Sequence, residues 1–101
     1  MRYNSDRKSM YEIIKVLNTK FYFKKDLNPL TDEYEYHIWI RHLVEPIDAI
    51  IAYLNKDEQI YNKIYKRYEA DSKENNLSVW YFYRNGNQNE IVIITAFKME
   101  Q

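Results

Sequence analysis

The chain has 101 residues, and its 15 basic and 15 acidic side chains balance. This length suits one domain spanning residues 1–101, and without cysteine its stability must come from packing, because disulfides and thiolate chemistry are excluded. At zero net charge no general attraction to nucleic acid or to anionic membranes is expected, so contact with nucleic acid would need a local patch.

No apolar run approaches the roughly 20 residues that span a bilayer, and the polar start, MRYNSDRKSM, lacks the apolar core of a signal peptide. We therefore expect a cytoplasmic protein with no membrane partner. Tyrosine occurs 11 times and glycine once. The tyrosines either form a binding surface, since each has a rigid ring with a polar tip, or reflect an AT-rich genome.

Residues 9–23 are predicted to begin as a helix. Ser9 can cap it, with Glu12 three residues on as a capping box, and apolar side chains then follow helical spacing. These are Met10, Ile13, Ile14 and Leu17. The FYF sequence favours an extended end, and residues 24–30 are predicted as a loop because they contain Asn28-Pro29.

The segment EYEYHIWIRH, residues 33–42, fits two geometries. As a strand, it places His37, Trp39 and Arg41 on one face; as a helix, it brings His37 and Arg41 together at i, i+4. Both geometries put His37 and Arg41 on the same side. The aromatic and β-branched residues favour a strand over residues 34–40.

The clearest amphipathic helix is predicted over residues 46–55. Pro46 suits the first turn of a helix, and apolar residues then recur at i, i+3, i+4 and i+7. These are Ile47, Ile50, Ile51 and Leu54. Similar spacing predicts a further helix over residues 57–70, and the polar residues 71–76 are predicted as a solvated loop.

The C-terminal part of the chain predicts a β-hairpin. Residues 77–84 and 90–98 are rich in aromatic and β-branched residues, and Asn85-Gly86 lies between them. The alternation places Thr95 on one face of the last strand with Ile91, Ile93 and Phe97, and both faces are apolar, so this strand is expected inside the sheet. The expected class is α+β, with N-terminal helices packed on a small antiparallel sheet that ends in the C-terminal hairpin.

His37, Arg41 and His42 form the most suggestive cluster. A histidine can act as a general acid or base near neutral pH, and an arginine beside it can hold a phosphate through two parallel hydrogen bonds. RNA cleavage without a metal needs such a pair, because the 2′-hydroxyl proton must move and the phosphorane needs a cation. In the alternative, Arg41 pairs with Glu45 or Glu33 and the histidines only rim the sheet.

Thr95 interrupts an apolar strand, where its hydroxyl would need a partner. It is either a donor to a phosphate or a residue that simply favours strands. Lys98 could add a cation at the end of this strand, and Arg84, at the end of the preceding one, is a candidate substrate-binding residue. No spacing of ligands such as HExxH indicates a metal site, and one glycine excludes a Gly-rich phosphate loop, so no cofactor is expected.

The order of HIWIRH, a helix begun by proline and a hairpin ending in IVIITAF resembles the small nucleases of the barnase–EndoU–colicin–RelE superfamily, especially their phage-associated and toxin members. The resemblance spans residues 9–98 in element order. It implies that His37 is the catalytic histidine, with His42 as the alternate. It also implies that Arg41 binds the phosphate and that Thr95 supplies the strand hydroxyl.

The leading hypothesis is a metal-independent endoribonuclease-like domain, of the toxin type, that transfers the phosphodiester of RNA to the 2′-oxygen. For a toxin, the resemblance implies a cognate inhibitor or antitoxin. The alternative is a non-enzymatic interaction protein, such as an immunity protein, an antitoxin or a phage inhibitor of a host factor, because aromatic surface residues anchor interfaces well. A third hypothesis is a nucleic-acid-binding regulator, for which only Lys63, Lys66 and Arg67 supply a basic face.

Overall fold

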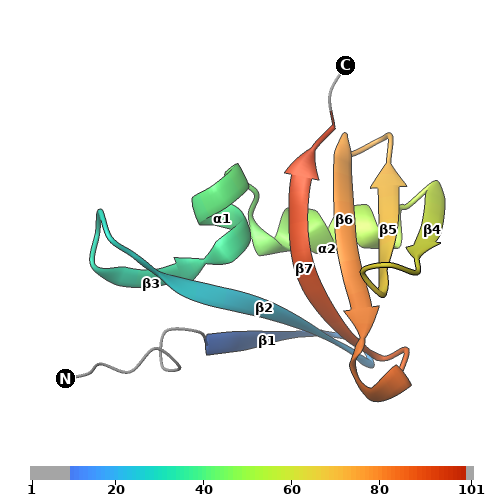
Figure 1. Ribbon diagram of the computed structural model, residues 1–101, viewed down its shortest axis with the longest axis horizontal. Helices are drawn as coiled ribbons and strands as arrows, with labels where there is room; N and C mark the ends of the chain where they lie inside the picture. The colour runs from blue at the N-terminus through green and yellow to red at the C-terminus, as the bar shows by residue number, and fades with distance from the viewer. Residues whose placement is uncertain (1–9, 100–101) are drawn as a thin grey trace.

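The computed structural model describes residues 10–99 as a strongly twisted sheet with two helices between its third and fourth strands (Figure 1). The strands are β1 (Met10–Val16), β2 (Thr19–Asn28), β3 (Glu33–Tyr36), β4 (Glu58–Asn62), β5 (Arg67–Ser72), β6 (Leu77–Tyr83) and β7 (Glu90–Lys98). The helices are α1 (His37–His42) and α2 (Pro46–Leu54), and a short 3-10 turn, η2 (Arg84–Gly86), lies between β6 and β7.

The expected class, N-terminal helices on a small antiparallel sheet, is wrong. The described residues form a seven-stranded sheet in the order β1-β2-β7-β6-β5-β4, with β3 paired to the far end of β2. Strands β2 and β7 run parallel, whereas the other neighbouring strands are antiparallel, so the sheet is mixed. The position of β7 between β2 and β6 confirms that the last strand lies inside the sheet.

Residues 10–28 are paired strands rather than a helix followed by a loop. The predicted helical spacing counted residues from both faces of β1: Ile14 packs against the core, whereas Ile13 is 52% exposed. Antiparallel pairing with β2 extends along the whole length of β1, and β2 continues to Asn28 because β3 pairs with its last residues. The predicted cap, Ser9, lies outside the described residues.

The strand expected over residues 34–40 ends at Tyr36, where α1 begins. This six-residue helix ends at Leu43, whose φ of 56° is left-handed. The N–H of Val44 then donates to the carbonyl of Ile38 at 3.3 Å, and both side chains are buried in the core. The N–H of Leu43 also donates to the carbonyl of Trp39 at 2.9 Å, which is the 5→1 hydrogen bond of the αL ending of a helix.

The helix expected over residues 46–55 is confirmed as α2, with Pro46 in its first turn. Its buried side is made by Ala49, Ile50 and Ala52, and it packs on β5 and β6. The other apolar residues of the predicted stripe face outward and are exposed. They are Ile47 (52%), Ile51 (38%) and Leu54 (59%).

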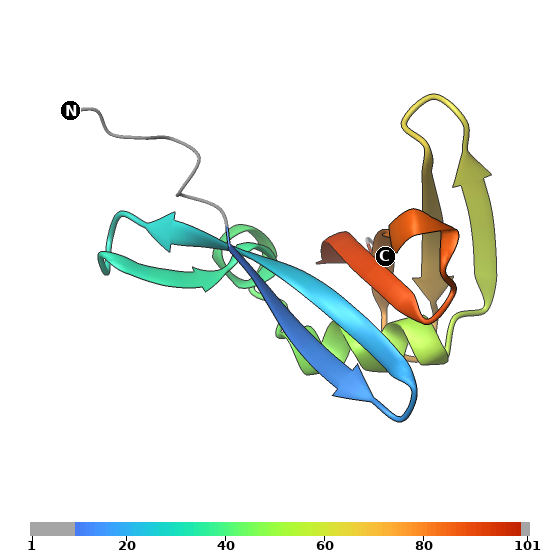
Figure 2. The same ribbon diagram turned by 90° about the horizontal axis from the view of Figure 1, so that it is seen from below.

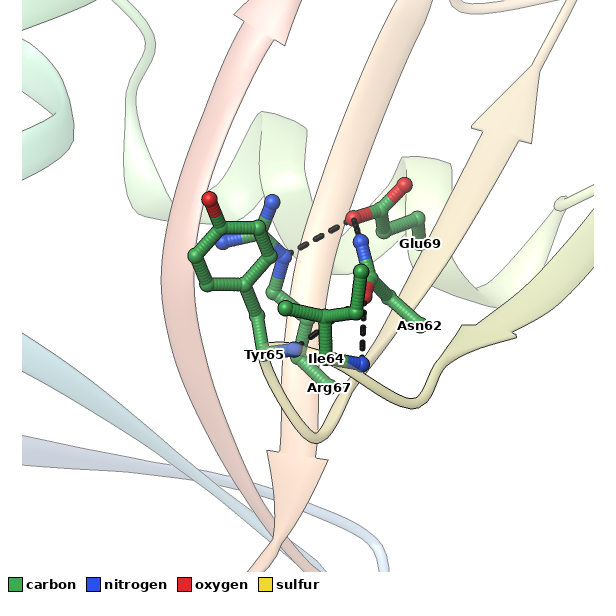
Figure 3. Close-up of polar contacts among 5 residues, drawn as sticks. All are labelled: Asn62, Ile64, Tyr65, Arg67 and Glu69. Carbon is green, nitrogen blue, oxygen red and sulfur yellow. Dashed lines mark hydrogen bonds and ion pairs between the residues drawn. The ribbon is translucent and has the colours of Figure 1, made fainter.

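Three hairpins in the described part of the chain share one loop design. One of them, β4–β5, occupies the region predicted as a helix over residues 57–70. Each loop has four residues, and a polar side chain just before it accepts a hydrogen bond from a loop N–H, as Asn62 does (Figure 3). The last loop residue has a positive φ, without glycine. The accepting residues are Asn28, Asn62 and Ser72, and the positive-φ residues are Asp32, Lys66 and Asn76.

The predicted hairpin of residues 77–84 and 90–98 is confirmed as β6 and β7, and Asn85 and Gly86 both have positive φ. The alternation predicted along β7 is wrong, because Trp80 pairs with Thr95 but Tyr81 pairs with Ile93. Ile94 is the extra residue of a β-bulge, which changes the side to which later residues point. Thr95 therefore lies on the face opposite to Ile93.

The two faces of the sheet differ in what covers them. One face packs on α2 and holds the core, whose largest side chains are Tyr81, Phe21, Phe23, Ile50, Ile91 and Ile93 (Figure 1). We call the other the open face; it carries Tyr22, Lys24, Trp80, Phe82, Val92, Thr95 and Phe97. Within residues 10–99 no helix has the length and apolar character required to cross a membrane.

Candidate functional site

His37 lies at a hollow on the open face, beside the central strands. The hollow has a volume of about 310 Å³ and lies next to the β-bulge of β7. Its lining residues come from β1, β2, α1, β6 and β7. They are Tyr11, Lys24, His37, Phe82, Val92, Ile93 and Ile94.

The imidazole of His37 is held by a carboxylate. Nδ1 of His37 lies 2.6 Å from Oδ2 of Asp26, and Nζ of Lys24 lies 3.7 Å from the other oxygen of the same carboxylate. An ionised carboxylate can only accept, so Nδ1–H donates and Nε2 is left to exchange a proton. A histidine oriented in this way, beside a cation in a hollow, is equipped for general acid or base chemistry.

Arg41 and His42 lie on the same short helix as His37. Arg41 is exposed, and within residues 10–99 neither Glu33 nor Glu45 forms an ion pair with it. The ring of His42 lies 5.8 Å from that of Phe97 on β7. Burial lowers the pKa of His42, and the positive charges of Arg41 and His37 lower it further. The three residues therefore form one electrostatic cluster.

Thr95 on β7 is adjacent in sequence to Ile94, which lines the hollow, but Thr95 itself does not line it. It is half-buried on the open face, opposite Trp80, and follows Ile94, which lines the hollow of His37. His37 therefore lines the same hollow as Ile94, the residue that precedes Thr95. Lys98 lies elsewhere: it lines a hollow with Leu43 and Asp48, on the side of the sheet that α2 covers.

Arg84 belongs to a second hollow, of about 270 Å³, which continues the first. The two hollows share Tyr11, Phe82 and Val92. Nη1 of Arg84 lies 2.9 Å from Oε1 of Glu90, and this hydrogen bond lowers the pKa of Glu90. Arg84 therefore lies at the far end of a continuous aromatic surface that begins at His37, with its charge engaged by Glu90.

Sequence analysis missed Asp26, which contacts the imidazole of His37, and Lys24, which lines the same hollow. The signal was present in β2, where FKKD places Lys24 and Asp26 two residues apart and so on one face of a strand. It was lost because residues 24–30 were predicted as a loop. Within residues 10–99 no three His, Asp or Glu side chains converge as metal ligands would.

The hollow thus combines an oriented histidine, a neighbouring lysine and an aromatic wall, and the helix of the histidine also carries an arginine without a carboxylate partner in the described part of the chain. This set can move a proton and stabilise negative charge. In comparisons with protein-family models, with curated proteins and with solved structures, no match to this chain was found.

Proposed function

We propose that this protein is a metal-independent endoribonuclease of the toxin type, with its site at the hollow of His37. The observation that carries the proposal is the 2.6 Å contact between His37 and Asp26 beside Lys24, at a hollow with an aromatic wall. The carboxylate orients the imidazole, and the lysine supplies positive charge. The aromatic side chains of the wall can stack on a nucleobase of the RNA. A toxin of this kind would be held inactive in its host by a protein inhibitor.

The proposed reaction transfers the phosphodiester to the 2′-oxygen. Nε2 of His37 removes the proton of the 2′-hydroxyl, the 2′-oxygen forms a bond to phosphorus, and the bond from phosphorus to the 5′-oxygen breaks. The leaving 5′-oxygen takes its proton from water. Lys24 and Arg41 stabilise the negative charge that builds on the phosphorane, and Thr95 is the proposed hydroxyl donor to the phosphate.

The test is cleavage of total RNA and of end-labelled oligonucleotides by the purified protein, with a 2′,3′-cyclic phosphate as the expected product. His37→Ala should lower cleavage by about 10²-fold or more. Arg41→Ala should do comparable harm and Arg41→Lys should rescue only in part, because lysine lacks the planar fork. His42→Ala is the matched control, since His42 is the other histidine of the chain and packs on Phe97.

Two results would overturn the proposal. One is a purified wild-type protein that cuts no RNA and arrests no host on expression. The other is loss of cleavage on addition of EDTA with recovery on addition of zinc or magnesium, since the proposed steps use only side chains and water.

A second candidate, a non-enzymatic interaction protein, is favoured by the outward side of α2. Ile47, Ile51 and Leu54 make an exposed apolar row there, on a helix whose N-cap is Glu45 and whose first turn carries Asp48. Such a row fits a partner that offers an apolar groove with a basic rim. Ile47→Asp should abolish capture of that partner and leave RNA cleavage unchanged, which separates the two functions.

A further inference from the structure

The loop end of the β4–β5 hairpin carries a local positive charge in a neutral chain, whereas the acidic residues of this hairpin, Glu58, Glu69 and Asp71, lie on its strands. Residues 61–68, YNKIYKRY, contain Lys63, Lys66 and Arg67 and no acidic residue. The hairpin projects from the sheet on the side opposite α2, so that its loop is the part farthest from that helix (Figure 2). Ile64 and Tyr65 in this loop are 82% and 66% exposed.

The side chain of Asn62 holds the loop in place through hydrogen bonds to the loop backbone and to Glu69. Oδ1 of Asn62 accepts from the backbone N–H groups of Ile64, at 3.0 Å, and Tyr65, at 3.1 Å (Figure 3). Nδ2 of Asn62 donates to Oε2 of Glu69, at 3.0 Å. A surface that is ordered before binding loses less conformational entropy when it binds.

The carboxylate of Glu69 is already engaged within the hairpin. The same Oε2 accepts a hydrogen bond from Nε of Arg67 at 2.8 Å. Burial alone would raise the pKa of Glu69, but the hydrogen bonds from Arg67 and Asn62 lower it. By contrast, Lys63 and Lys66 are exposed and have no carboxylate partner in the described part of the chain.

Aromatic rings connect this loop to α1 across the open face. The guanidinium carbon of Arg67 lies 4.6 Å from the ring centre of Tyr65 and 3.8 Å from that of Trp80. Trp80 then contacts Phe97 at 5.2 Å, and Phe97 contacts His42 at 5.8 Å. Arg67 thus holds the Tyr65 ring in place while most of that ring stays accessible to a ligand.

We infer that the β4–β5 hairpin binds a single strand of nucleic acid, with a base stacked on Tyr65 and phosphates at Lys63 and Lys66. Every base has a π-face, so a held aromatic ring recognises any unpaired base, and lysines neutralise the backbone. Glu58, Glu69 and Asp71 line the hollow below Trp80, so the phosphates run along the outer, lysine side while bases turn toward the rings. A duplex keeps its bases stacked inside and cannot offer one to Tyr65.

This inference names single-stranded RNA as the substrate class. The assignment of RNA as substrate rests on the proposed function, whereas binding itself is measured without cleavage. The probe is a labelled RNA of about 12 nucleotides, followed by fluorescence anisotropy with the catalytically impaired His37→Ala variant. Tyr65→Leu should weaken binding by about fivefold or more, and Tyr65→Phe should leave it unchanged, because stacking needs only the ring.

The lysines are tested through the dependence of affinity on salt. The double change Lys63→Gln, Lys66→Gln should reduce the slope of log affinity against log salt by about 1.4, from two lost phosphate contacts on a single strand. Lys73→Gln is the matched control, because Lys73 is exposed in the equivalent four-residue loop between β5 and β6. Circular dichroism should show the same fold for all variants.

The outcomes separate this inference from the proposed function. It is overturned if the single strand does not bind, if the matching duplex binds as tightly, or if the Tyr65 and lysine variants bind like wild type. Competition by poly-glutamate at equal charge concentration would also overturn it, in favour of an acidic protein partner. Binding by Tyr65 without any cleavage would sink the nuclease and leave the inference standing.

Discussion

Nδ1 of His37 lies 2.6 Å from Oδ2 of Asp26, and this contact ties the first residue of α1 to the strand β2. The two residues are 11 apart in sequence, and a change of chain direction at the β2–β3 hairpin brings them together. The contact fixes both the position of α1 and the tautomer of the imidazole. The same contact therefore contributes to the fold and to the proposed chemistry.

The first prediction concerns Asp26 as a positioning residue. Asp26→Asn keeps the volume but loses the charged acceptor, so the imidazole is less well oriented and kcat for RNA cleavage should fall by about tenfold or more, with KM little changed. Asp26→Glu should recover part of the loss. An unchanged kcat with a raised KM would show that Asp26 serves only to bind RNA.

The second prediction concerns the core. Ile50 on α2 and Ile93 on β7 are 1% and 2% exposed, so Ile50→Ala and Ile93→Ala should each lower the free energy of unfolding by about 2–5 kcal/mol. Urea denaturation measures this. Ile47→Ala on the same helix is the control, because Ile47 is 52% exposed; equal losses at Ile47 and Ile50 would contradict the observed orientation of α2.

The third prediction concerns pH. The pKa of His42 is lowered by burial and by Arg41 and His37, so the unfolded chain takes up a proton at this residue more readily than the folded one. The stability that neutral His42 contributes is present above its ordinary pKa and is lost as pH falls through the folded pKa. Replacement by Gln removes the titrating group.

Urea midpoints at about pH 7.5 and about pH 5 check this prediction in wild type and His42→Gln. The wild-type midpoint should fall more than that of the variant as the pH is lowered. The two proteins differ only at residue 42, so the difference between their responses to pH isolates His42. Equal falls in the two proteins would show that charging His42 costs the folded state nothing.

The fourth prediction concerns a turn. Leu17 has a φ of 56° in the two-residue connection between β1 and β2 and is 89% exposed. Glycine adopts this conformation without steric cost, so Leu17→Gly should raise the free energy of unfolding by about 0.5–1 kcal/mol, after allowing for the greater freedom of the unfolded chain. Leu30→Gly should give no gain, because Leu30 is equally exposed but its φ is not positive.

The turn chemistry also explains why strands of the β1–β2 and β4–β5 hairpins were predicted as helices. Leu17, Asp32, Lys66 and Asn76 end or form turns at positive φ, where glycine is the usual sequence signal. This chain has one glycine, at the one hairpin that was predicted correctly. Without that signal, the four-residue loop at residues 63–66 left Ile60, Ile64 and Tyr68 at helical spacing, and two paired strands were predicted as a helix.

The parts that sequence predicted well are those fixed by local chemistry. Pro46 and the periodicity after it define α2, and Asn85-Gly86 defines the last hairpin. His37 and Arg41 lie four residues apart on α1, which is the helical alternative and not the favoured strand. The pairing of Lys24 and Asp26 on one strand face was readable from the sequence, but their place beside His37 depends on the pairing of β2 with β3, and the bulge at Ile94 depends on a register that only the folded sheet sets.

Strand β7 is the one element that links the two halves of the sheet in the described part of the chain: β2 pairs with one of its edges and β6 with the other. Lys20 on β2 can therefore pair with Glu90 only after β7 has been synthesised. On the ribosome, the first hairpin and its two helices would emerge with an unsatisfied strand edge, and sheet closure would follow synthesis of the last strand. Contacts so distant in sequence make folding slow, and they leave the newly made chain open to pairing with another copy until β7 arrives.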